Sequence, residues 1–242
     1  MGTPVIETTL EIGTLAQWAS ATATFLAVLV ALFKDEMLRW WRKPKLSVSI
    51  ALASPDCHKT KLTYTIQKTA LTYVAADCYY LRMWVTNVGK TRAERVQVFA
   101  SKLSRQSADS SFKEVEAFLP MNLRWAHGQQ AGNVPEIFAE GISPMMGKHC
   151  DLGHVMDPKF RKDIGEDLAG VPDDQTILSL DLEIKPNTLS HLITPGVYRL
   201  ELRVAAANSA PVTKVIEITI TGKWFEEQAK MFTDGLGLRI IK

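Results

Sequence analysis

The sequence predicts a mainly β protein, with an N-terminal transmembrane helix followed by an antiparallel β-sandwich and a short C-terminal helix. Residues 12–33 form a run of twenty-two residues without a charge. A helix of that length reaches about 33 Å, enough to cross a hydrocarbon core of about 30 Å. Residues 46–222 contain short segments of alternating apolar and polar residues separated by turns, without a long helical period. This pattern is typical of an antiparallel sandwich or barrel.

The composition excludes two classes of protein. The 242 residues include 28 Lys and Arg against 26 Asp and Glu, so no strong field draws the chain to nucleic acid. The three cysteines, Cys57, Cys78 and Cys150, are an odd number at wide spacings, unlike the disulfide framework of a small secreted scaffold. We therefore expect no nucleic-acid partner and a reducing compartment.

Basic residues flank the apolar run on its C-terminal side only. Residues 1–11 contain no Lys or Arg, whereas residues 34–45 form a basic, aromatic juxtamembrane segment that ends the helix near Pro44. By the positive-inside rule we expect a single-pass protein of the bacterial inner membrane, with residues 1–11 as a short tail outside and the soluble domain in the cytoplasm. The predicted interface residues are Lys34, Arg39, Trp40, Trp41, Arg42, Lys43 and Lys45.

Two other interpretations of residues 12–33 compete with a membrane anchor. A cleaved signal peptide has a basic n-region and a shorter apolar core, but the preceding tail carries Glu7 and Glu11 instead. The core helix of a soluble protein seldom runs for so long without a charge and with a basic aromatic collar at one end. Both features favour the anchor.

One face of the predicted span carries small residues. Alanines recur at every fourth position, and small residues let membrane helices approach closely. The pattern predicts helix self-association and a homo-oligomer, with the frequency of alanine in membrane helices as the competing explanation. The face consists of Ala19, Ala23, Ala27 and Ala31 with Ser20 and Thr24.

The predicted sandwich spans residues 46–222 and starts directly after the juxtamembrane segment. Residues 58–76 are interpreted as a long hairpin or a loop, and the charged residues 159–174 as an insertion between strands. The predicted strands are 46–50, 79–86, 95–103, 118–125, 137–142, 177–184, 197–205 and 212–221.

Residues 223–242 are predicted to form an amphipathic helix and a tail. Phe225, Ala229 and Phe232 share one face of a helix over residues 223–233, which Gly235 terminates. The alternating residues 236–241 favour an additional edge strand.

Two passages carry a family resemblance. Residues 85–98, VTNVGKTRAERVQV, resemble the strand and N-x-G turn of bacterial immunoglobulin-like domains of the CARDB type. Residues 195–202, PGVYRLEL, resemble the approach to their penultimate strand, where Tyr198 would form a tyrosine corner. With the exit WRKPKL at residues 41–46, the chain resembles uncharacterised bacterial single-span membrane proteins that have such a domain. The resemblance implies an immunoglobulin-like sandwich that binds or scaffolds, without catalytic residues, although residues 112–174 exceed a minimal domain.

One cluster offers metal-binding chemistry. His149, Cys150 and His154 lie among carboxylates within nine residues, and on a regular strand Cys150 and His154 would share a face. No second half of a zinc motif accompanies them. A buried cysteine among polar residues is the competing interpretation, and we expect no cofactor.

Three functions follow, in order of preference. The first is a membrane-anchored cytoplasmic binding or scaffold module with a protein partner, which is not an enzyme. The second is a membrane-disrupting effector of the bacterial defence type, triggered through the soluble domain, for which the alanine face is the only support. The third is a metal-dependent enzyme that uses residues 149–157.

Overall fold

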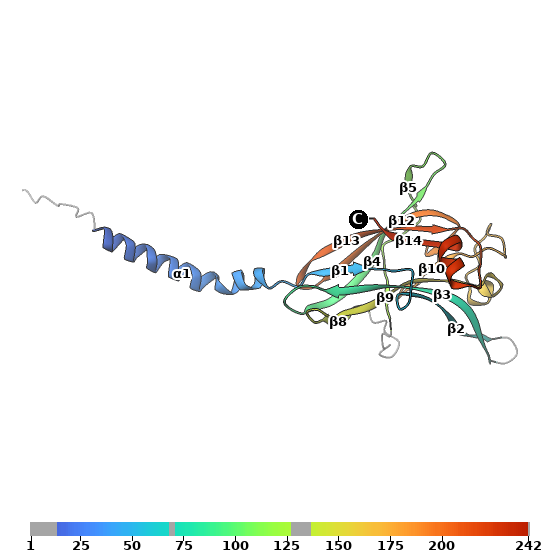
Figure 1. Ribbon diagram of the computed structural model, residues 1–242, viewed down its shortest axis with the longest axis horizontal. Helices are drawn as coiled ribbons and strands as arrows, with labels where there is room; N and C mark the ends of the chain where they lie inside the picture. The colour runs from blue at the N-terminus through green and yellow to red at the C-terminus, as the bar shows by residue number, and fades with distance from the viewer. Residues whose placement is uncertain (1–13, 68–70, 127–136, 242) are drawn as a thin grey trace, which may run out of the picture. The chain divides into compact units, whose positions relative to one another are not determined.

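The computed structural model describes residues 14–67, 71–126 and 137–241, and it divides the chain into two compact units (Figure 1). The first unit is Met1–Lys43 and contains the helix α1 (Leu15–Trp41). The second is Pro44–Lys242 and contains the strands. The boundary falls at the end of the basic juxtamembrane segment, while the predicted tail 1–11 lies outside the described residues.

Helix α1 is longer than the apolar run that predicted it. At its start the backbone N–H of Thr14 donates to Gln17 Oε1 at 2.8 Å, and at its end the N–H of Arg42 donates to Leu38 O at 2.9 Å. Its segment Leu15–Glu36 is apolar and long enough to cross a membrane; it shares residues 15–33 with the predicted span 12–33, whose residues 12–13 lie outside the described residues. The helix continues through the first part of the predicted juxtamembrane segment and ends at Trp41, so this part is not a separate element.

The strands form two antiparallel sheets, which overlap in the view of Figure 1. The first sheet has the order β1 (Leu46–Ser49), β3 (Leu71–Asn87), β9 (Gly147–Met156), β10 (Leu178–Leu180), β11 (Leu192–Ile193), with β2 (Cys57–Gln67) paired to β3 and β7 (Arg124–Trp125) paired to β9. The second has the order β14 (Leu236–Ile240), β13 (Ser209–Ile220), β12 (Gly196–Ala206), β4 (Ala93–Gln106), β5 (Phe112–Glu114), with β6 (Met121–Asn122) and β8 (Ala139–Ile142) paired to β4.

A single main core joins the two sheets. Alternate residues of β3, such as Leu81 and Met83, share it with alternate residues of β12, such as Leu200 and Leu202, and all four are fully buried. Each such side chain contributes about 1.5–3 kcal/mol by leaving water. The predicted antiparallel sandwich is therefore confirmed, with the inner faces packed together and two outer faces turned away from the core.

A β-bulge interrupts the alternation in each sheet. In β9, Leu152 is the extra residue, because Leu81 pairs with Gly153 while Arg82 pairs with Asp151. In β4, Ser101 is the extra residue opposite β12. A bulge shifts the following side chains to the other face of a strand. Successive core residues are therefore three positions apart at each bulge. In β9 they are Leu152 and Val155, and in β4 they are Ala100 and Leu103.

The strand predictions hold best where one face only is buried. Strands β1, β4, β12 and β13 match their predicted ranges, and residues 58–76 belong to a long β2–β3 hairpin. Residues 118–125 and 177–184 form shorter strands than predicted. Strand β9 was absent from the predicted set, although it is the middle strand of the first sheet. The insertion 159–174 begins with the 3-10 helix η1 (Pro158–Ile164).

The C-terminal segment is part of the sandwich. Helix α2 (Gln228–Lys230) continues into the π-helical turn η2 (Met231–Gly235), so the predicted helix starts about five residues too early. Ala229 is exposed, contrary to the predicted apolar face, and Met231 is the fully buried residue. The predicted edge strand is present as β14, which pairs with β13.

Candidate functional site

The small residues of α1 lie on an uncovered surface of the first unit. Ala19, Ala23, Ala27 and Ala31 are all exposed, as are Ser20 and Thr24. The Thr24 hydroxyl donates to the backbone O of Ser20 at 2.9 Å, so this polar group is satisfied inside the helix. That bond lowers the cost of placing the threonine in lipid.

The predicted interface residues divide between the two units. Lys34, Arg39, Trp40 and Trp41 belong to the last turns of α1, and Arg42 caps it. Lys43 ends the first unit, whereas Lys45 belongs to the second. Trp41 is 73% exposed.

The three residues of the predicted metal cluster face different surroundings. Cys150 is fully buried in the core, and its burial raises the pKa of the thiol well above its ordinary value. His149 Nε2 lies 3.0 Å from Asp56 Oδ1. His154 lies on the outer face of the sheet because of the bulge at Leu152, so the expectation that it shares a face with Cys150 is wrong. Within the described residues, no three His, Cys, Asp or Glu side chains are grouped to hold a metal ion.

His154 instead belongs to a buried ion triad on the outer face of the first sheet. Its Nδ1 lies 3.0 Å from Asp181 Oδ1, and its Nε2 lies 3.1 Å from Glu166 Oε1. The three residues are 8% exposed or less. With a carboxylate at each ring nitrogen, the imidazole carries both protons and a positive charge. This occupation of both nitrogens leaves none for a metal ion.

Aromatic and charged side chains continue the triad along β3. The Tyr80 ring stacks on the His154 ring, with centroids 5.9 Å apart and planes at 17°. The Arg82 guanidinium lies 5.0 Å from the Tyr80 centroid, and its Nε donates to Asp151 Oδ1 at 3.0 Å.

Interactions within the triad determine the protonation states of its three side chains. Burial disfavours protonation of His154, but the hydrogen bond with Asp181 and the negative charges of Asp181 and Glu166 outweigh it and raise the pKa of His154 to about 10. Burial opposes ionisation of both carboxyls, yet His154 holds the pKa of each below its ordinary value. Burial also raises the pKa of Asp151 to about 6. Because the His154 ring is buried with a carboxylate at each nitrogen, the triad has the geometry of a structural ion cluster.

A covering segment, residues 158–177, supplies Glu166 to the triad. The segment folds around Arg161, which is only 1% exposed and whose Nη1 donates to Gln175 O at 3.1 Å. Arg161 Nη2 also lies 3.3 Å from the carbonyl oxygen of Pro172. Buried hydrogen bonds of a cation to carbonyl groups hold the segment in one conformation.

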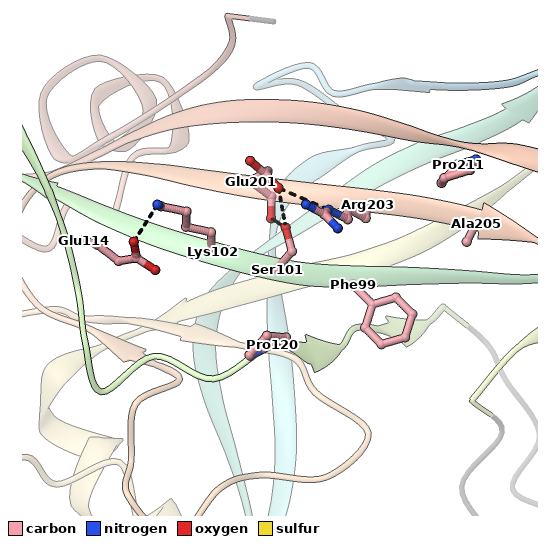
Figure 2. A pocket seen from close by; sticks show the side chains of 9 residues that line it. All are labelled: Phe99, Ser101, Lys102, Glu114, Pro120, Glu201, Arg203, Ala205 and Pro211. Carbon is pink, nitrogen blue, oxygen red and sulfur yellow. Dashed lines mark hydrogen bonds and ion pairs between the residues drawn. The ribbon is translucent and has the colours of Figure 1, made fainter.

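An open groove lies on the outer face of the second sheet (Figure 2). Its volume is about 740 Å³. The lining combines apolar and charged side chains from β4, β5, β12, β13 and the loop before β6: Phe99, Ser101, Lys102, Glu114, Pro120, Glu201, Arg203, Ala205 and Pro211.

The bulge in β4 shapes the centre of the groove. Ser101 Oγ lies 2.9 Å from Glu201 Oε1, and Arg203 Nε donates to the same oxygen at 3.2 Å. Lys102 forms an ion pair with Glu114, as Figure 2 shows. The extra residue places Ser101 and Lys102 together on the groove side, an effect common beside binding sites.

The groove has the chemistry of a binding surface. Its lining residues include no histidine or cysteine, so Ser101 has no imidazole base beside it within the lining. Two cations and two carboxylates line the groove together with Phe99, Ala205 and two prolines, which suits a ligand with both charged and apolar groups. Neither the groove residues nor the carboxylates of the triad belong to a motif in the sequence. Core positions on the two sides of each bulge are three residues apart in the sequence. That spacing is the signal that would have located the groove and the triad.

Comparisons of the chain with protein-family models, with curated proteins and with solved structures each found no match.

Proposed function

We propose that the protein is a membrane-anchored binding module that holds a protein partner in the groove of Figure 2. The observation that carries this proposal is the contrast between the outer faces of the sandwich. The covering segment occupies the first, whereas the second presents an open, amphipathic groove. Charged residues line one part of the groove and Phe99, Ala205 and Pro211 another, so an extended peptide with both kinds of side chain fits it better than a small apolar ligand does.

The anchor in this proposal is α1, in a bacterial inner membrane with the sandwich in the cytoplasm. The basic residues after the apolar segment support this orientation, and the buried, unpaired state of all three cysteines suits a reducing compartment. The exposed alanine face supports self-association of the helix. The bacterial immunoglobulin-like resemblance supports binding rather than catalysis.

Fractionation and a topology reporter test the anchor. The full chain should stay in the membrane pellet after carbonate extraction, and a reporter fused after Lys242 should be active in the cytoplasm. A periplasmic signal would contradict the proposed orientation. Substituting both Ala23 and Ala27 by Leu should weaken oligomers in a membrane association assay, and an unchanged oligomer would contradict the proposed helix face.

Charge reversal tests the groove. We expect Glu201→Arg to abolish co-purification of the partner with the tagged full chain from membranes. Glu217→Arg is the matched control, because Glu217 lies on β13 outside the groove, where it pairs with Arg199 and Arg239. Equal recovery of the partner with both variants would contradict the role of the groove.

A further inference from the structure

We infer that the end of the sandwich where β1 begins is a second interaction surface, one that contacts an anionic lipid bilayer. This inference rests on the proposed membrane anchor and goes beyond the binding groove. The surface, called here the basic turn end, consists of the first residues of the second unit and three turns, namely residues 44–45, 88–92, 143–146 and 207–208.

Exposed apolar side chains gather at the basic turn end. Across the described part of the second unit, six large hydrophobic side chains are exposed, and three of them belong to this end. Val88 is 46% exposed, Met145 76% and Met146 61%. Unbranched methionine adapts to irregular apolar surroundings, and apolar side chains at this density favour contact with the headgroup and acyl boundary.

Hydrogen bonds fix these turns to the start of β1. The N–H of Val88 donates to Lys45 O at 2.8 Å, and the N–H of Met145 donates to Asn87 O at 2.8 Å. The N–H of Asn87 donates in turn to Met146 O at 2.9 Å. The exposed side chains are therefore one or two hydrogen bonds away from Lys45.

The buried Asn87 side chain locks this arrangement. Its Oδ1 accepts from the N–H groups of Lys45 at 3.1 Å and Gly89 at 3.0 Å. Its Nδ2 donates to the carbonyl oxygens of Thr91 at 2.7 Å and Ile142 at 2.9 Å. A buried amide with all of its hydrogen-bonding groups used holds the turns as one rigid surface.

Chain length and charge identify the bilayer as the occupant. Trp41 ends α1 and Leu46 begins β1, so the linking chain reaches at most about 18 Å from the anchor. The four segments of the basic turn end contain Lys45, Lys90 and Arg92 and no acidic residue. Clustered basic residues close to a membrane helix are attracted by anionic lipids.

Depth-dependent fluorescence quenching tests this inference on the full chain. The variant Met145→Cys, labelled with a thiol-reactive fluorophore, is reconstituted in nanodiscs with anionic lipids that carry brominated acyl chains. The native cysteines are fully buried and will not take the label. Ala108→Cys is the matched control, because Ala108 is exposed in the turn after β4, about 40 Å along that strand from Ala93.

We expect loss of fluorescence at position 145, none at position 108, and a weaker loss when zwitterionic lipids replace the anionic ones. A chain that stays in the nanodisc but shows no quenching at position 145 overturns the surface and leaves the anchor intact. Protection of that label by a protein contact without lipid quenching also overturns it. A chain that separates from the nanodisc overturns the anchor and the lipid contact together.

Discussion

The two outer faces of the sandwich carry similar polar side chains in different surroundings. A one-residue bulge shapes each face, at Leu152 in β9 and at Ser101 in β4. On the first face, the covering segment buries His154 between two carboxylates. On the second, Glu201 and Arg203 pair at the floor of an open groove. We therefore expect the buried charges to matter for stability, and the exposed charges of the groove to matter for the proposed binding.

The largest expected effect comes from removing the centre of the ion triad. His154→Leu removes the cation between Asp181 and Glu166 and leaves both carboxylates buried, with the half-exposed Lys185 3.9 Å from Glu166 Oε1. This loss should cost about 3–5 kcal/mol in free energy of unfolding. Urea titration of the solubilised full chain, followed by tryptophan fluorescence, measures it. Glu201→Ala in the groove is the comparison, with an expected change within about 0.5 kcal/mol. Equal losses for the two variants would show that the two faces do not differ as described.

Close packing of β9 against β10 predicts the next effect. A Cβ at Gly153 would lie 2.2 Å from the backbone oxygen of Ser179, so Gly153→Ala has to displace β10. We expect a loss of about 1–3 kcal/mol in the same titration. Gly237→Ala in β14 is the control, because its Cβ would meet Thr219 at an ordinary 3.5 Å. An unchanged free energy of unfolding for Gly153→Ala would mean that the first sheet tolerates repacking beside the triad.

The triad also predicts how stability depends on pH. The pKa of His154 is about 10 in the folded chain and 6.5 ordinarily, so its stabilisation is complete below pH 6.5 and is lost as the pH rises through 10. The lowered pKa values of Asp181 and Glu166 give the opposite dependence, with stability lost on acidification. Asp151, with a pKa of about 6, costs stability as the pH rises from 3.8, so the clearest window is pH 7–10.

Thermal unfolding between pH 7 and 10 checks this dependence. The melting temperature should fall with pH in the native chain. The fall should be smaller in His154→Gln, whose side chain does not titrate. Parallel curves for the two proteins would contradict a charged His154 at neutral pH.

The smallest effect on stability is expected in the groove. Arg203→Ala removes an ion pair in which Arg203 is 61% exposed, and exposed pairs contribute about 0–1 kcal/mol. Calorimetry should show an almost unchanged melting temperature, while partner recovery falls. A marked loss of stability would assign Arg203 to the structure rather than to binding.

The sequence predicted the parts of the fold that follow a single period. The apolar run predicted α1, and simple alternation predicted β12 and β13, because each of these strands buries one face only. Strand β9 escaped prediction because both of its faces are buried and its bulge breaks the alternation. The C-terminal helix was placed too early because Phe225 and Phe232 fit a helical period that the chain adopts only from Gln228.

The candidate sites were less predictable because they depend on distant residues. The sequence predicts His154 as a metal ligand, whereas its partners in the structure, Glu166 and Asp181, come from separate segments that no local motif connects to it. The groove arises where β4 meets β12, and neither strand alone carries a binding motif. Which residues lie opposite each other on paired strands depends on the strand register, and a bulge changes that register.

Site-specific photocrosslinking tests the central claim, that the second outer face is the binding face, most directly. A photoreactive phenylalanine analogue replaces Phe99 in the groove, and in a separate chain it replaces Phe160 on the covering segment. We expect a specific protein adduct in the membrane fraction at position 99, lost on Glu201→Arg, and none at position 160. An adduct at position 160 but none at position 99 would contradict it.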